Sequence, residues 1–306
     1  MKIGLGIFDI DGVLVDVRES YRKAIVRTTL AYLTEYLKLD FRTPFTVNDA
    51  VVSSFKECGG FNNDWDLTAS IISYVVSVSR NDIKSGLDEF LKSVKMNGGG
   101  FSAVEKVLGG LPPGVKYSGD VCSGNVIKRI FQEYYFGAER FRQRFGLEPE
   151  FNRQEGFFIK ERLLFTSALL DQLRKVLVLS VATGRDAYEC GMVMERFSIG
   201  KYFAVVINND DIRKDEERLG RQGLSKPNPH IIEKVIGKSC YPGKIYYFGD
   251  TADDMISAVN CRKYEVIPVG CVYALNQPEK TAEKLISAGA RYIMHAPDQI
   301  FEVIDA

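Results

Sequence analysis

The sequence predicts an α/β protein in which a doubly wound parallel sheet is interrupted by an inserted all-helical domain. One observation is an apolar strand at the start of the chain, Ile3 to Phe8, which is followed at once by two aspartates. A second is the segment 17–160, which has helical periodicity and no convincing strand. The third is a run of alternating apolar strands and helices from residue 165 onward, which is typical of a parallel sheet covered on both faces.

Composition sets broad limits on function. The chain has 306 residues, which suggests two domains, with 45% apolar and 26% charged residues. Its 40 basic and 40 acidic residues cancel, so we expect neither a nucleic-acid-binding nor a membrane-binding surface. No apolar run is long enough to span a bilayer, and the N-terminus lacks a signal-peptide pattern. A cytoplasmic location is therefore expected.

Cysteine and histidine usage narrows the chemistry further. The six cysteines are scattered without any CxxC pair, so neither a zinc site nor a disulfide framework is predicted. There are only two histidines, His230 and His295, and His230 is interpreted as a helix-surface residue. This scarcity favours carboxylates as the groups that transfer protons.

The two aspartates after the first strand, Asp9 and Asp11, point to a cation. Carboxylates placed side by side at the end of a buried strand repel one another and lose hydration. A bound cation relieves both costs, and hard oxygen ligands suit Mg²⁺. The alternative is a turn with two solvated aspartates, since Asp and Gly12 are ordinary turn formers.

Helical segments fill the region after Asp16. The first is predicted over Val17–Leu37, and the polar residues Thr46, Asp66 and Asn81 are expected to open later helices. Glycine-rich breaks separate these segments. Two further helices are predicted, over Ser102–Leu108 and Ser123–Phe136.

Strands and helices then alternate to the C-terminus. Helices are expected at Phe165–Arg174, Asp186–Phe197, from Pro229 and at Pro278–Ser287, and Asn208–Gly223 is expected to be mostly surface loop. Strands are predicted at Val176–Val181, Phe203–Ile207, Ile245–Phe248, Tyr264–Val269 and Tyr292–His295. Ligands of such sheets bind at the carboxyl ends of the strands. Since polar groups follow three of these ends, at Asp9/Asp11, Thr183 and Asp250, the first strand belongs with the later ones. The predicted core is 1–16 with 161–306, and the insert is 17–160.

Four short motifs occur in order along this core. They are Asp9-Ile10-Asp11-Gly12, the apolar strand that ends in Thr183, the proline-flanked Lys226, and the segment from Gly249 to Asp254. Together they resemble the DxDG, hhhT, Lys and GDxxxD motifs of the haloacid dehalogenase (HAD) superfamily hydrolases. The position of the insert resembles that of the C1-type helical cap of subfamily I. Each motif is weak alone, but four in order at strand ends are specific.

The resemblance implies catalytic roles. Asp9 would be the nucleophile that forms an aspartyl-phosphate, and Asp11 the general acid and then the general base. Thr183 would hold phosphoryl oxygens, and Lys226 would neutralise charge in the transition state.

Metal and substrate contacts are also implied. Mg²⁺ would be held by Asp9, the Asp11 main chain and Asp250, with Asp254 as a supporting residue and Asp253 only a helix-start residue. Substrate would contact Thr183, Gly184, Arg185, Lys226 and, from the insert, Arg18. For Arg185 a surface position is an equal alternative, and for the basic run Arg140, Arg142 and Arg144 a solvated helix face is favoured.

The predicted function is therefore a Mg²⁺-dependent phosphatase that acts on a small phosphorylated metabolite. A phosphomutase on the same scaffold, or a non-catalytic binding or regulatory module, are the alternatives, while dehalogenase and phosphonate hydrolase chemistry fit less well. The insert is larger than the common four-helix cap, which leaves the substrate open. The oligomeric state, monomer or homodimer, is not predicted.

Overall fold

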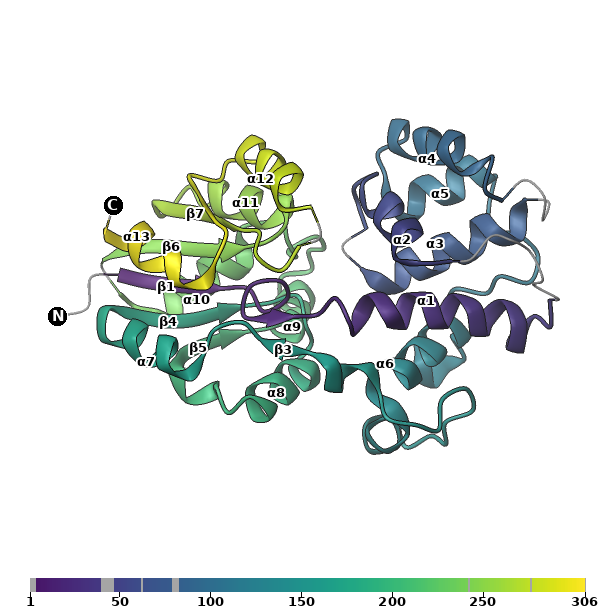
Figure 1. Cartoon of the computed structure of the whole chain (residues 1–306), viewed down its shortest axis with the longest axis horizontal. Helices are drawn as coiled ribbons and strands as arrows, with labels where there is room; N and C mark the ends of the chain where they lie inside the picture. The colour runs from purple at the N-terminus through teal and green to yellow at the C-terminus, as the bar shows by residue number, and fades with distance from the viewer. Residues whose placement is uncertain are drawn as a thin grey trace. The chain divides into compact units, whose positions relative to one another are not determined.

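A computed structural model describes residues 4–39, 47–61, 63–78, 83–241, 243–275 and 277–305. The chain forms two compact units (Figure 1). One comprises Met1–Asp16 together with Arg162–Ala306, and the other comprises Val17–Glu161. No helix in the described ranges is both long enough and apolar enough to cross a membrane.

The first unit is built on a parallel sheet that has six strands in the described part of the chain. The strands are β1 (Gly4–Phe8), β4 (Leu177–Ala182), β5 (Phe203–Ile207), β6 (Lys244–Gly249), β7 (Val266–Cys271) and β8 (Tyr292–Met294). Their order is β5-β4-β1-β6-β7-β8, so the sheet grows outward in both directions from β1. The switch point of the topology, where ligands bind in such sheets, therefore lies at the carboxyl end of β1.

Helices cover both faces of this sheet, which confirms the predicted fold class (Figure 1). They are α7 (Ser167–Val176), α8 (Ala187–Arg196), α9 (Asn209–Leu219), α10 (His230–Ser239), α11 (Ala252–Val259), α12 (Pro278–Ser287) and α13 (Ile300–Asp305).

The alternation of side chains along β1 explains why both faces are buried. Leu5 and Ile7 point to one face, where they join a core cluster with apolar residues of α10 such as Val235. Phe8 points to the other face and stacks on Phe248 with ring centroids 4.6 Å apart. A strand that is buried on both sides needs an apolar residue at every position with a side chain, as the sequence of β1 provides.

A short antiparallel ribbon connects the two parts of the chain that form the α/β unit. Strand β2 (Val15–Asp16) pairs with β3 (Arg162–Leu163), with Val15 opposite Leu163 and Asp16 opposite Arg162. This ribbon was not predicted, because two-residue strands carry no periodic signal. Both connections to the inserted segment therefore leave from one paired element.

The second unit is helical, and no strand is found among its described residues. Its helices are α1 (Tyr21–Ala31), α2 (Asp49–Lys56), α3 (Asp64–Ser77), α4 (Leu87–Met96), α5 (Gly100–Leu108) and α6 (Val126–Phe145). Helix α1, which ends in a π-helical turn at Tyr32–Tyr36, packs on α3 and α6. Tyr21 of α1 stacks on Tyr135 of α6 with ring centroids 4.5 Å apart.

Several predicted boundaries were wrong because capping residues were misassigned. The segment Asn208–Gly223 is not mostly loop, because Asn208 and Asp211 form a capping box that opens α9. Helix α3 is capped by Asn63 and not opened by Asp66. Helix α6 begins after Asn125 and continues to Phe145 through a kink at Gly137. The predicted helix starts Thr46 and Asn81 lie outside the described residues.

Candidate active site

Acidic side chains gather at the carboxyl end of the central strands. Asp9 directly follows β1, and its main-chain N–H donates to the Phe248 carbonyl oxygen at 2.9 Å, which extends the β1–β6 pairing. Asp250 follows β6, and Asp254 lies in the first turn of α11. One carboxylate oxygen from each of Asp9, Asp250 and Asp254 lies within 4.8 Å of the other two. Three carboxylates therefore converge at the switch point of the sheet.

Gly12 allows the turn after β1 to approach Asp250. The glycine has a φ of 71°, in the left-handed region that other residues rarely adopt. A Cβ atom at this position would collide with the Asp250 carboxylate. The main-chain N–H of Gly12 also donates to the Val15 carbonyl oxygen at 2.9 Å, which closes the turn. Glycine at this position lets the loop bearing Asp9 and Asp11 pack against the end of β6.

Lys226 is the cation of this cluster. Its Nζ atom lies 2.7 Å from Asp254 Oδ1 and 3.2 Å from Asp9 Oδ1. Burial lowers the pKa of a lysine, but here the Asp254 and Asp9 carboxylates outweigh burial and raise the pKa of Lys226. Lys226 therefore stays charged next to Asp9.

Asp254 is bonded through both of its carboxylate oxygens. Oδ1 accepts from Tyr247 Oη at 2.7 Å in addition to pairing with Lys226. Oδ2 accepts from Thr251 Oγ1 at 2.6 Å and from the Thr251 N–H at 3.1 Å, within a capping box. Although burial opposes ionisation, Lys226 and these hydrogen bonds hold the pKa of Asp254 below its ordinary value. Tyr247 and Thr251 were not predicted as site residues, although the Thr-x-x-Asp spacing is the sequence signature of a capping box.

Asp9 and Asp250 differ from Asp254 in their electrostatics. Burial, with repulsion from Asp254 and Asp11, raises the pKa of Asp9 to about 7 against the pull of Lys226. The pKa of Asp250 is also raised well above its ordinary value, by burial and by repulsion from Asp254 and Asp9. Asp9 Oδ1 is buried and makes no hydrogen bond with the described residues, although Lys226 Nζ lies nearby as an ion pair. The Asp9 and Asp250 carboxylates lie close together, and Asp9 Oδ1 lacks a hydrogen-bond donor within the described part of the chain. These two residues are therefore suitable ligands for a hard divalent cation such as Mg²⁺.

Thr183 lies at the end of β4, on the other side of β1. It is fully buried, and its N–H donates to the Ile207 carbonyl oxygen at 3.0 Å. Its Oγ1 accepts from the Arg185 N–H at 3.2 Å. The Arg185 N–H is therefore engaged within the turn. Gly184 has open space around its α-carbon.

The Asp11 side chain is not part of the cluster of Asp9, Asp250 and Asp254, because it is paired with Arg185. Arg185 Nε donates to Asp11 Oδ1 at 2.8 Å, and Nη2 lies 2.6 Å from the same oxygen. The Arg185 side chain is 1% exposed, and the Asp11 side chain is 34% exposed. Arg185 is thus a buried residue, so the alternative interpretation of a surface arginine is wrong.

Comparison with protein families identifies the family of this chain. Residues 5–262 match the sequence profile of the haloacid dehalogenase-like hydrolases. The chain belongs to the haloacid dehalogenase-like hydrolase family. This HAD-like hydrolase thus carries its four predicted motifs on the fold that the family uses.

Solved structures with related folds include phosphatases. Phosphatase Tt82 from Thermococcus thioreducens is 22% identical, with a TM-score of 0.62 over 91% of this chain and 99% of that one. A predicted phosphoglycolate phosphatase from Haemophilus somnus 129pt is 14% identical, with a TM-score of 0.56 over 99% of both chains. A structural-genomics target solved by X-ray crystallography is 17% identical, with a TM-score of 0.66 over 100% and 98%. At these identities the likeness shows the fold alone. A comparison with curated proteins found no match.

A cluster of ion pairs joins α9 to α10 next to the Lys226 loop of this hydrolase. Asp215 of α9 is 6% exposed and accepts from Lys234 Nζ at 2.6 Å. It also lies 2.8 Å from His230 Nε2 and 2.9 Å from Arg218 Nη2. His230, interpreted as a helix-surface residue, is half-buried at the start of α10, where its ring contacts this cluster. The cluster ties together the two helices that flank Lys226.

Other predicted residues lie in the helical unit. Arg18 precedes α1 and is half-buried, and its role stays a prediction. The basic run is used within its own unit: Arg142 pairs with Glu148 at 2.8 Å, and Arg140 and Arg144 lie over phenylalanine rings. Asp253 lies in the first turn of α11.

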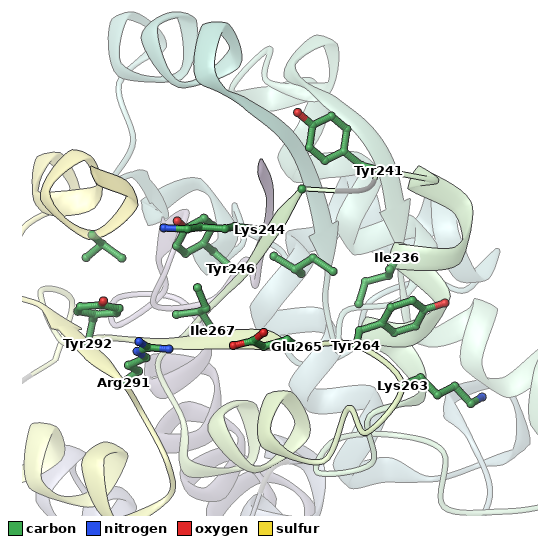
Figure 2. Close-up of a pocket in the computed structure, with 13 residues that line it drawn as sticks. Ile236, Tyr241, Lys244, Tyr246, Lys263, Tyr264, Glu265, Ile267, Arg291 and Tyr292 are labelled. Atoms are coloured by element: carbon green, nitrogen blue, oxygen red, sulfur yellow. The ribbon is translucent and has the colours of Figure 1, made fainter. Parts of the chain in front are cut away.

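A cavity of about 660 Å³ lies away from the carboxylates (Figure 2). It opens around the amino-terminal parts of β6 and β7 and includes Lys244, Tyr246, Tyr264 and Arg291 among its lining residues. None of the predicted site residues lines it. Since the motifs lie at the opposite ends of these strands, the cavity is separate from the candidate active site.

Proposed function

We propose that this HAD-like hydrolase is a Mg²⁺-dependent phosphatase that hydrolyses a small phosphorylated metabolite through an aspartyl-phosphate on Asp9. The observation that carries the proposal is the convergence of Asp9, Asp250 and the Lys226–Asp254 ion pair at the carboxyl edge of the sheet. Phosphatases among the structural neighbours are consistent with it.

Mg²⁺ would be held by Asp9, Asp250 and the main-chain carbonyl of Asp11, and would screen the repulsion between Asp9 and a phosphate dianion. That repulsion is about 4 kcal/mol per charge pair at 4 Å with an effective dielectric constant near 20. Asp254 would pair with Lys226 instead of the metal, because Lys226, Tyr247 and Thr251 already occupy its two carboxylate oxygens.

The chain's own groups would carry out two displacements. In the first, a carboxylate oxygen of Asp9 bonds to phosphorus while the ester P–O bond breaks, and Asp11 gives a proton to the departing oxygen. In the second, water bonds to phosphorus, Asp11 takes a proton from that water, and the Asp9–phosphorus bond breaks. The products are an alcohol and inorganic phosphate. Lys226 and Thr183 would hold the phosphoryl oxygens and their negative charge throughout.

We also propose that the helical unit acts as a cap that excludes water during the first displacement. Its two connections leave the α/β unit from the β2–β3 ribbon, which begins three residues after Gly12. Because both connections pass through this ribbon, it is a suitable hinge for movement of the helical unit.

The test is release of inorganic phosphate from p-nitrophenyl phosphate by the purified protein, with Mg²⁺ and with EDTA. We expect Mg²⁺-dependent activity that Asp9→Asn reduces by about 10³-fold or more, because the substituted amide is a poor nucleophile. Circular dichroism of Asp9→Asn serves as the folding control. An inactive wild type, or a fully active Asp9→Asn variant, would contradict the proposal.

A further inference from the structure

The backbone of Arg185 makes hydrogen bonds through both its N–H and its carbonyl oxygen. Its N–H donates to Thr183 Oγ1, and its carbonyl oxygen accepts from the Asn209 N–H at 2.9 Å. Asp186, the next residue, caps α8 by accepting from the Glu189 N–H. The backbone on both sides of Arg185 is therefore fixed by the strand end and by the helix start.

The guanidinium of Arg185 lies beneath Asp11. The Arg185 side chain is 1% exposed and the Asp11 side chain 34% exposed, so solvent reaches the carboxylate and not the guanidinium. Both Nε and Nη2 contact one oxygen of Asp11, Oδ1, which leaves the second oxygen outside this contact. A planar guanidinium with two donors on one acceptor restricts the rotation of that carboxylate.

We infer that Arg185 is a positioning residue: it holds Asp11 by Oδ1 so that Oδ2 faces the oxygen of the leaving group. This inference rests on the proposed function, in which Asp11 transfers the proton. Arg185 then affects catalysis through Asp11 and not by binding the phosphoryl group. The proton moves from Asp11 Oδ2 to the bridging oxygen as the P–O bond breaks, and it returns to Asp11 from water in the second displacement.

Dependence on the leaving group distinguishes these roles. Loss of proton donation harms a basic leaving group, such as phenolate, far more than a weakly basic one, such as dinitrophenolate. The experiment measures kcat and KM on a series of aryl phosphates from dinitrophenyl to phenyl. The proteins are wild type, Arg185→Gln, Arg185→Lys, Asp11→Asn and the double variant Asp11→Asn/Arg185→Gln. Inhibition by inorganic phosphate reports the affinity for the phosphoryl group, and thermal melting reports folding.

We expect Arg185→Gln to lower kcat/KM by about 10- to 100-fold for phenyl phosphate and by much less for dinitrophenyl phosphate. Its phosphate inhibition constant should stay within about threefold of wild type, Arg185→Lys should recover part of the loss, and Arg185→Gln should add little in an Asp11→Asn background. Equal losses on every substrate, with weaker phosphate inhibition, would assign Arg185 to substrate binding and overturn the inference. An unchanged leaving-group dependence in a folded Arg185→Gln protein would also overturn it. If the wild type hydrolyses no aryl phosphate, the proposed function fails first, and the inference fails with it.

Discussion

Asp254 Oδ1 lies 2.7 Å from Lys226 Nζ, closer than the 3.2 Å between this nitrogen and Asp9 Oδ1. Tyr247 donates to the same oxygen, and Thr251 donates twice to the other one. Because these donors fix both oxygens of Asp254, this carboxylate is suited to be the counter-ion of Lys226. Asp9 and Asp250, whose pKa values are raised by burial and by their neighbours, are better suited to a cation.

Substitution of Asp254 and of Asp250 should therefore give different defects. We expect Asp254→Asn to lower kcat by about 100-fold while the Mg²⁺ concentration for half-maximal activity changes less than threefold, because Lys226 loses its counter-ion. Asp250→Asn should raise that Mg²⁺ concentration by about 10-fold or more. Both are measured by Mg²⁺ titration of phosphate release. A shifted Mg²⁺ requirement in Asp254→Asn would assign Asp254 to the metal.

The neighbouring tyrosines of β6 form a matched pair. Tyr247 Oη donates to the ionised Asp254 at 2.7 Å, whereas Tyr246 Oη donates to the Ile304 carbonyl oxygen at 3.4 Å. Tyr247→Phe should lower the free energy of unfolding by about 1.5–3 kcal/mol, because hydrogen bonds to charged groups are the stronger ones. Tyr246→Phe should cost about 1 kcal/mol or less. Urea denaturation compares the two, and equal losses would show that the Asp254 contact contributes nothing special.

The contribution of Asp9 to the stability of the metal-free protein should fall as the pH rises from 4 to 7. The pKa of Asp9 is raised from 3.8 to about 7, so the folded state binds this proton more tightly than the unfolded state. The stabilisation is present below pH 4 and is lost as the pH passes through 7. With EDTA present, wild type should therefore weaken relative to Asp9→Asn across this range. Thermal melting measures the difference, and a constant difference between the two proteins would contradict the prediction.

Mg²⁺ should reverse that loss. Binding to the folded state alone stabilises it by mass action, so Mg²⁺ should raise the melting temperature of wild type at pH 8. It should raise that of Asp250→Asn much less. Equal shifts in the two proteins would place the ion elsewhere.

The contribution of Asp215 to stability should depend on pH in the opposite sense to that of Asp9, and should fall as the pH is lowered. Hydrogen bonds from Lys234 and His230 outweigh burial and hold the pKa of Asp215 well below its ordinary value. Its contribution is therefore present above about pH 4 and is lost as the pH falls further. Asp215→Asn should lower the free energy of unfolding at pH 7 by about 1.5–3 kcal/mol, and by less at pH 3.

The exposed pair between Arg142 and Glu148 provides the control for Asp215. Both of its side chains are largely in solvent, so Glu148→Gln should cost about 1 kcal/mol or less. Urea denaturation at pH 7 and pH 3 measures both variants. An Asp215→Asn protein as stable as Glu148→Gln would contradict a stabilising role for the Asp215 ion-pair cluster.

The sequence by itself determined the fold class and the motif positions of this protein. Buried parallel strands need continuous apolar runs, and β5 and α12 were predicted with the bounds that the structure gives. Because the carboxyl ends of parallel strands meet at one edge, Asp9, Thr183 and Asp250 could be expected together from the sequence alone. Helix starts were less predictable, because several polar residues near Asp66 and Asn208 could each serve as a cap.

Only the tertiary structure decided which acidic residue serves which partner. Asp11 and Asp254 are both aspartates at strand ends or helix starts, yet one pairs with Arg185 and the other with Lys226. Tyr247 reads in the sequence as one more apolar strand residue, and its hydroxyl gains a role only where β6 meets α11. The physical reason is the separation along the chain. Periodicity is a local pattern that reports which face of a helix or strand a residue occupies. Ion pairs can join distant residues, such as Asp11 and Arg185, which are 174 residues apart.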